Sequence, residues 1–185
     1  MSSSNILFIG KRFLCDPSGG REMLSSLTFR IVKEIFQDQC YTFEIDSHSK
    51  FYPEPSLMNK IFKSHLDGIS PLMINSINEI IDQNNINKVF IDGSNLGFFA
   101  KKIKAKFPKI HIFCSFHNVE AKFFFDSLIR KKSLKSAAIL LANFLSERKA
   151  VLNSDHIIAL TKNDSKNLDK IYGKFAHSIV PIALE

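Results

Sequence analysis

Short apolar segments of strand length alternate along this chain with segments of helical periodicity, and this alternation constrains its fold more than any other feature. Helices are expected between the strands, where apolar residues recur at helical spacing, as over 21–36, 70–81 and 161–172. The expected strands span 5–10, 40–46, 88–93, 109–116, 155–161 and 177–182. Continuous apolar strands joined by helices require crossover connections, so the sheet should be mostly parallel and covered on both faces. We therefore predict an α/β fold, a doubly wound Rossmann-like sheet forming one domain over residues 1–185.

Composition narrows the classes of protein that this chain can belong to. Hydrophobic residues make up 45% and charged residues 23%, which is typical of a globular domain. No run approaches the roughly 18 apolar residues of a spanning helix. The three cysteines are far apart and suggest neither a disulfide framework nor a zinc site. A cytoplasmic protein without a bound metal is the expectation.

The formal net charge of +7 raises the question of an anionic partner. The basic residues are scattered except in "IRKKSLK" at 129–135, and no recognition-helix, RNP or zinc-finger signature accompanies them. We therefore expect no nucleic acid, while an anionic lipid surface and a phosphate-bearing substrate both remain open.

In a doubly wound sheet the ligand lies beyond the carboxyl ends of the strands, which directs attention to the segment "DPSGGRE". Its glycines, Gly19 and Gly20, would let the backbone approach a phosphate at the start of a helix, with Arg21 directly after them. The segment matches neither a dinucleotide fingerprint nor a P-loop. A flexible turn explains it equally well.

A second candidate follows the fourth expected strand, in "HNVE". The imidazole of His117 is suited to orienting a sugar hydroxyl or to acid/base work, and Asn118 and Glu120 add hydrogen-bonding groups. The alternative is that His117 and Asn118 only cap the next helix, which spacing alone favours. In the neighbouring "DGSNLG", Asp92 ends the third strand and Asn95 is expected to cap a helix.

The stretch "KFFFDSLIRKKSLK" combines phenylalanines with a cationic cluster. Phe124 beside Arg130, Lys131 and Lys132 has the composition of a segment that lies at a membrane interface. A core position for Phe123–Phe125, with solvated lysines, is the other interpretation.

The ordered set of segments resembles the N-terminal domain of GT-B-fold glycosyltransferases, particularly the retaining family-4 type. The matching segments are "ILFIGKRFLCDPSGGREMLSSL", "IFCSFHNVE", the helix with Glu147 before "SDHIIALTKNDSKNL", and "SIVPI". The resemblance spans nearly the whole chain. It departs from the family at Asn118, where an acidic residue often follows the histidine.

The resemblance implies an acceptor-binding half of a nucleotide-sugar-dependent enzyme for cell-surface polysaccharide or glycolipid synthesis. Gly19 and Gly20 would approach the donor diphosphate and His117 would line the cleft near the transferred sugar. No cofactor or metal is implied. The donor would be shared with a C-terminal domain that this chain lacks, so we expect no sugar transfer by the chain alone.

The partners implied are therefore a nucleotide-sugar donor, a sugar or lipid-linked acceptor, and a membrane surface in peripheral contact. The alternative function is a non-catalytic Rossmann-like subunit that binds or docks onto a separate partner chain.

Overall fold

A computed structural model describes residues 4–14, 16–17, 19–45, 56–66 and 68–181 of the chain. Within these residues six parallel strands form one sheet in the order β2-β1-β3-β4-β5-β6. The strands are β1 (Ile6–Lys11), β2 (Cys40–Ile45), β3 (Lys88–Asp92), β4 (His111–Phe116), β5 (His156–Ala159) and β6 (Ser178–Ile179). The predicted α/β, doubly wound, parallel fold is confirmed. Asp46 and Ile182, the last residues of two expected strands, lie outside the described residues.

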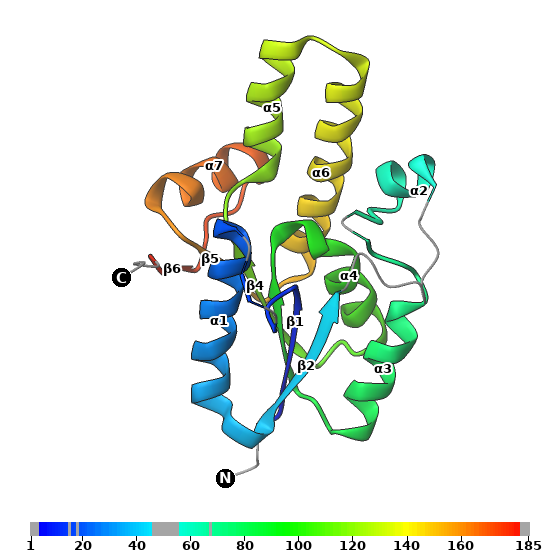
Figure 1. Ribbon diagram of the computed structural model, residues 1–185, viewed down its shortest axis with the longest axis vertical. Helices are drawn as coiled ribbons and strands as arrows, with labels where there is room; N and C mark the ends of the chain where they lie inside the picture. Colours follow the sequence, from blue (N-terminus) through cyan, green and yellow to red (C-terminus); the bar gives the residue numbers. More distant parts are fainter. Residues whose placement is uncertain (1–3, 15, 18, 46–55, 67, 182–185) are drawn as a thin grey trace.

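The helices connect successive strands and lie on both faces of the sheet (Figure 1). They are α1 (Gly20–Phe36), α2 (Leu57–Phe62), α3 (Met73–Gln83), α4 (Gly97–Lys106), α5 (Glu120–Lys131), α6 (Leu134–Asn153) and α7 (Lys162–Tyr172). Short 3-10 turns, η1 (Gln37–Gln39) and η2 (Ser94–Leu96), follow α1 and β3. α2 lies within the segment 51–68, for which the sequence indicated only a proline-containing loop, and a six-residue helix is too short to show a period.

Side chains from alternate positions of the strands β1 to β5 supply two hydrophobic clusters, one on each face. Leu7, Ile9 and Ile91 lie in the larger cluster together with buried residues of α3, α4 and α6. Phe8 and Phe90 lie on the other face, where their rings stack at 5.3 Å between centroids. Since both faces are buried, the strands read as continuous apolar runs rather than as alternating ones.

α1 covers the sheet with a face that only partly coincides with the one its sequence indicates. Its periodicity places Leu24, Leu27, Ile31 and Ile35, with Val32 and Phe36, on one face. Val32 is buried and Phe36 packs against the core, as this predicts, but Ile31 and Ile35 are exposed, and Ser25, Ser26 and Thr28 are buried instead. The hydroxyl of Thr28 donates to the carbonyl oxygen of Leu24 at 2.9 Å, which satisfies this polar group within the helix.

α5 and α6 form a helical hairpin that extends beyond the end of the sheet (Figure 1). The other end of α6 packs tightly against α4 through Gly97. A Cβ atom placed on Gly97 would lie 2.0 Å from the carbonyl oxygen of Ser146 and 2.6 Å from the amide nitrogen of Ala150. Glycine is therefore needed here for the close approach of two backbones.

We predict that Gly97→Ala lowers the free energy of unfolding by about 3 kcal/mol, because the atoms that it meets belong to the backbone and have little freedom to move. Chemical denaturation followed by circular dichroism measures the change. Gly20→Ala is the matched control, since a Cβ there meets nothing within 4 Å. A Gly97→Ala protein as stable as the control would show that α4 and α6 can separate without loss.

Candidate functional site

The carboxyl ends of β3 and β4 bring Asp92 and His117 together. In the register of these parallel strands Asp92 lies beside Ser115, and His117 follows two residues later. The imidazole Nε2 of His117 lies 2.8 Å from Oδ1 of Asp92, a hydrogen bond in which the ring N–H donates to the carboxylate. The aspartate side chain has 0% of its surface exposed and the histidine 11%, so the pair is shielded from solvent.

Two polar atoms of this pair have no hydrogen-bond partner among the described residues, namely Oδ2 of Asp92 and Nδ1 of His117. With the proton on Nε2, the neutral ring keeps a lone pair on Nδ1 that can accept a hydrogen bond. Buried polar atoms are nearly always satisfied in folded proteins. Both atoms are themselves buried, so a hydroxyl group can satisfy them only where it penetrates to the pair.

The helix-capping interpretation of His117 and Asn118 is wrong. α5 is preceded by Val119 as its N-cap residue, and no side chain caps it there. His117 is turned to Asp92 instead, and Asn118 is exposed at the bend between β4 and α5. The imidazole is thus committed to a neighbouring strand rather than to its own helix.

The glycine pair opens α1 at the same edge of the sheet. Gly19 is the N-cap residue and Gly20 begins the helix, beside a cavity of about 300 Å³ that Lys11, Arg21 and Glu22 also line. A Cβ on either glycine would meet nothing within 4 Å. Packing does not require glycine at these two positions, and the surface above them is open to a ligand. Ser18, in the same predicted loop, lies outside the described residues.

Arg21 connects this helix start to the end of β3. Its Nη2 donates to Oδ1 of Asn95 at 3.0 Å. Asn95 was expected to cap a helix, but it lies inside η2, and the residue before α4 is Leu96. Gly93 precedes η2 with φ +126°, and a Cβ there would lie 2.9 Å from Oδ1 of Asn95. Glycine is required at this turn by both its backbone angle and the packing of Asn95.

These residues follow the carboxyl ends of β1, β3 and β4, and β1 and β3 are neighbours in the sheet. The chain leaves β1 for β2 on one side and returns to β3 on the other, which makes the boundary between β1 and β3 the topological switch point of the sheet. Ligands of doubly wound sheets bind at such points. At this edge Gly19, Gly20 and Arg21 line a cavity, while the buried Asp92 ends β3 and His117 follows β4, one strand away.

A buried carboxylate, Glu147 of α6, organises the loops that border the site. Its Oε1 accepts hydrogen bonds from the Ser94 hydroxyl and the backbone N–H of Glu120, each at 2.8 Å. Its Oε2 accepts from the backbone N–H of Ala121 at 2.9 Å and from the Tyr172 hydroxyl at 2.8 Å. Glu147 is fully buried, so these four donors replace its contact with water.

The environment shifts the titration of this cluster. Burial raises the pKa of Glu147, while hydrogen bonds from Ala121, Tyr172, Ser94 and Glu120 act in the opposite direction. Burial, followed by the charge of Glu147 and the hydrogen bond to it, raises the pKa of Tyr172. The tyrosine therefore stays protonated and serves as a donor.

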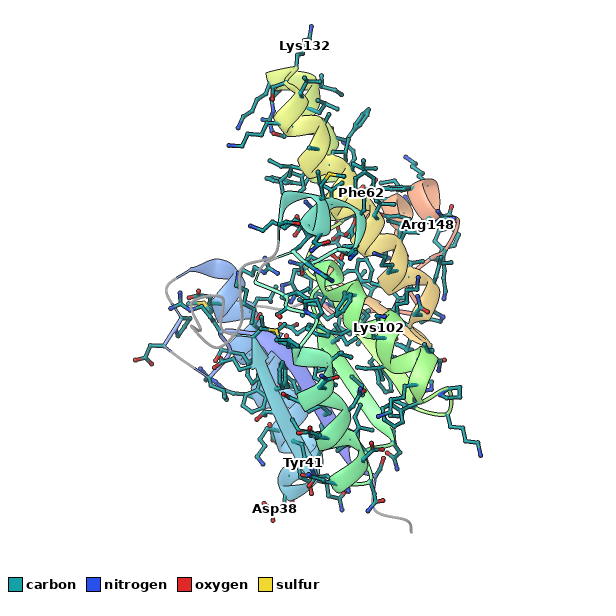
Figure 2. All side chains as sticks on the ribbon, turned by 90° about the vertical axis from the view of Figure 1, so that its right-hand side faces the viewer. Asp38, Tyr41, Phe62, Lys102, Lys132 and Arg148 are labelled. Carbon is teal, nitrogen blue, oxygen red and sulfur yellow. The ribbon has the colours of Figure 1, made fainter. Side chains whose placement is uncertain are left out.

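The cationic stretch occupies the far end of the α5–α6 hairpin. Arg130, Lys131 and Lys132 are exposed, and Lys132 lies at the tip of the hairpin (Figure 2). Phe123 and Phe125 are about half exposed, which contradicts a core position for them, whereas Phe124 is only partly exposed. Phe124 was the expected membrane-facing residue, but its two neighbours present more apolar surface.

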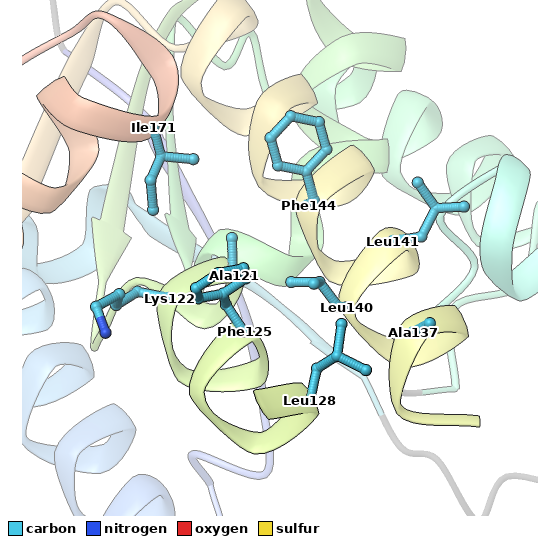
Figure 3. Close-up of a pocket in the computed structure, with 9 residues that line it drawn as sticks. All are labelled: Ala121, Lys122, Phe125, Leu128, Ala137, Leu140, Leu141, Phe144 and Ile171. Atoms are coloured by element: carbon cyan, nitrogen blue, oxygen red, sulfur yellow. The ribbon is translucent and has the colours of Figure 1, made fainter. Parts of the chain in front are cut away.

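An apolar cleft of about 500 Å³ lies between the two helices of this hairpin (Figure 3). Phe125 and Leu128 of α5 border it on one side, and Leu140 and Phe144 of α6 on the other. Further along the hairpin, Leu134 has 92% of its surface exposed. The hairpin thus combines exposed apolar side chains with basic ones.

The structure brings all six expected site residues to the carboxyl edge, but not in equal roles. Gly19, Gly20, Arg21 and His117 border the switch-point region, whereas the backbone N–H of Glu120 is turned to the buried Glu147. The sequence did not reveal that Asp92 partners His117. Its position at the end of the adjoining strand was the available signal.

No model of a protein family matches this chain, and no curated protein matches it. Across the described ranges, no helix combines the length and the apolarity that crossing a membrane requires. Nor do three or more His, Cys, Asp or Glu side chains of the described residues form a group that could hold a metal ion.

We predict that Glu147→Gln lowers the free energy of unfolding by about 3 kcal/mol. The amide nitrogen of glutamine would face two hydrogen-bond donors, which leaves buried polar groups unsatisfied. Tyr172→Phe removes a single donor and should cost about 1.5 kcal/mol. Denaturant unfolding measures both. A Glu147→Gln protein that loses no more stability than Tyr172→Phe would contradict the role of Glu147 in holding these loops together.

Proposed function

We propose that this chain is the acceptor-side half of a nucleotide-sugar-dependent glycosyltransferase acting in cell-surface polysaccharide or glycolipid synthesis. One observation carries the proposal. A buried His117–Asp92 pair, each partner with an unused acceptor atom, lies at the ligand-binding edge of a doubly wound sheet. The resemblance to GT-B enzymes suggests that the reaction at this pair is glycosyl transfer from a nucleotide sugar.

In this proposal His117 contacts the sugar and Asp92 is a positioning residue. The carboxylate holds the Nε2–H tautomer of the ring and fixes its orientation. The lone pair on Nδ1 then accepts a hydrogen bond from a sugar hydroxyl. Since the pair is buried, this interaction forms where water competes little for it.

The donor diphosphate is placed near Gly19 and Gly20. The open surface above the glycines lets phosphate oxygens approach the start of α1, where the helix dipole favours negative charge. Lys11 and Arg21 line the same cavity and add positive charge. The remainder of the donor would be bound by a second domain, so transfer requires both halves.

The test of this function is an assay of the whole gene product with uridine, guanosine and adenosine diphosphate-sugars. With the active donor, His117→Ala should lower kcat by about 10²-fold, as loss of a positioned imidazole does. Asp92→Asn should lower kcat by a comparable factor and change the pH profile, because the amide allows the ring tautomer in which Nδ1 carries the proton and no longer accepts.

A matched control is His111→Ala, at an exposed position on the opposite end of β4. Binding of none of these donors to the whole product would overturn the proposal and favour the non-catalytic docking subunit. The 185-residue chain alone is expected to show no turnover.

The α5–α6 hairpin extends the proposal to the membrane. Apolar side chains of Phe123, Phe125 and Leu134 are exposed close to Arg130, Lys131 and Lys132. Within the described residues none of these three basic side chains forms an ion pair, so their charge is complementary to an anionic lipid surface. Peripheral attachment at the inner face of the membrane would bring a lipid-linked acceptor to the site.

Vesicle co-sedimentation tests this attachment. Each basic side chain near an anionic surface contributes about 1 kcal/mol, so Arg130→Glu, Lys131→Glu and Lys132→Glu together should weaken binding by about 10²-fold or more. Binding of the original protein should fall as salt is raised. The control is Lys162→Glu, Lys166→Glu and Lys170→Glu on α7. Equal losses in both triple variants, or no binding to anionic vesicles, would remove the membrane role.

A further inference from the structure

A cleft of about 510 Å³ with a cationic lining lies between α2, the start of α3, α4 and α6, apart from the residues that border the switch point. Lys63 enters it from the loop after α2, Lys101 and Lys102 from α4, and Lys149 from α6. Figure 2 shows Lys102 on the face that is turned to the viewer. Lysines from three separate segments of the chain thus line one hollow.

The lysines of α4 differ in a way that marks this cleft. Lys104 pairs with Asp155 at 2.7 Å and Lys106 with Asp82 at 3.4 Å. Lys101 and Lys102, on the side of the cleft, form no ion pair within the described part of the chain. Of the described residues that line the cleft, none is acidic. Acidic side chains therefore neutralise Lys104 and Lys106, whereas Lys101 and Lys102 keep an unneutralised charge that can attract an anion.

His65 gives a second, independent indication of a ligand. It lines the cleft with only 3% of its surface exposed, and its Nδ1 has no hydrogen-bond partner among the described residues. Its ring meets that of Phe98 edge-on at 4.9 Å between centroids. A buried ring nitrogen without a partner, on a residue that lines a hollow of positive charge, can be satisfied by an anionic oxygen that reaches it.

The charges of the cleft act on one another. Burial, and then the charges of Lys63, Lys149 and Lys102, lower the pKa of His65. Burial, and then the charge of Lys101, lower the pKa of Lys149. The Lys149 ammonium donates a hydrogen bond to the Ser64 hydroxyl at 2.7 Å. This hydroxyl is neutral and cannot offset the positive charge of Lys149. Bringing like charges together is unfavourable, and a bound anion would relieve it.

We propose that this lysine cleft, defined by Lys63, His65, Lys101, Lys102 and Lys149, binds a phosphorylated small molecule. Phosphate oxygens accept hydrogen bonds from several ammonium groups at once, which suits a set of lysines better than a single carboxylate does.

The rest of the lining indicates what carries the phosphate. Phe62, Ile74 and Phe98 provide an apolar wall beside the lysines. The volume of the cleft lies within the range typical of small-molecule sites and exceeds what one phosphate ion fills. The ligand is therefore a phosphate ester whose less polar body packs against the aromatic rings. The site shares no residue with the Asp92–His117 pair and does not depend on the proposed glycosyl transfer.

Titration of the whole protein with pyrophosphate, followed by NMR, tests the proposal. We expect saturable shifts of the His65 ring signals and an upward change of the His65 pKa, because a bound anion stabilises the charged imidazolium. Lys101→Glu with Lys102→Glu should weaken binding at least tenfold. Lys162→Glu with Lys166→Glu, on α7, makes the same change in net charge at exposed positions and should leave binding unaltered.

The phosphate could belong to a free small molecule or to a lipid headgroup. Binding to phosphatidylcholine vesicles with and without phosphatidic acid distinguishes the two. Pyrophosphate binding that is lost in the Lys101/Lys102 variant assigns a free phosphorylated molecule. Loss of phosphatidic-acid-dependent vesicle binding in that variant, with binding kept in Lys162→Glu with Lys166→Glu, assigns a lipid headgroup phosphate. Non-saturating shifts with pyrophosphate and no such vesicle effect, or equal losses in the α7 control, would overturn the site.

Discussion

The buried carboxylate of Glu147 is the interaction on which the arrangement of this molecule most depends. An ionised side chain without partners is very costly inside a protein, and here four donors from three different segments supply its hydrogen bonds. Ser94 belongs to η2, Glu120 and Ala121 begin α5, and Tyr172 ends α7. Moving any of these segments away from α6 would leave the charge exposed to an apolar interior.

The same carboxylate sets the geometry of the candidate site. Ser94 is two residues after Asp92, and Glu120 is three residues after His117. The loops that follow β3 and β4 are therefore held to one point of α6 directly after the two residues that meet. The hydrogen bonds that Glu147 accepts thus hold in place the two loops on which the 2.8 Å contact between His117 and Asp92 depends. Catalytic constellations need such support, because a small displacement of an imidazole weakens its action strongly.

The sequence predicted the class of fold and one side of the site, for physical reasons. Apolar strands buried on both faces are recognisable without a structure, and their carboxyl ends identify the edge where His117 lies. The partner of His117 was not recognised, because that required knowing that β3 and β4 are neighbours and in which register they pair.

Other features escaped the sequence because they depend on tertiary contacts. The helix α1 carries apolar residues on more than one face, so periodicity identified only part of the buried one: it included Val32 but missed Ser25, Ser26 and Thr28. The lysine cleft joins residues as distant as Lys63 and Lys149, and only folding brings them together. The exposure of Phe123 and Phe125 follows from a hairpin that extends past the sheet.

The two cationic surfaces, at the tip of the α5–α6 hairpin and in the lysine cleft, have little electrostatic influence on each other, although both adjoin α6. Lys135, near the start of α6 and close in sequence to Lys132 at the hairpin tip, is 14 residues before Lys149 of the lysine cleft. At 1.5 Å per residue this is about 21 Å along the helix axis. The Debye length at physiological ionic strength is about 8 Å, so charges at the hairpin tip have little influence on the cleft. Each surface therefore binds an anion independently. A substitution at one leaves the electrostatic potential at the other essentially unchanged.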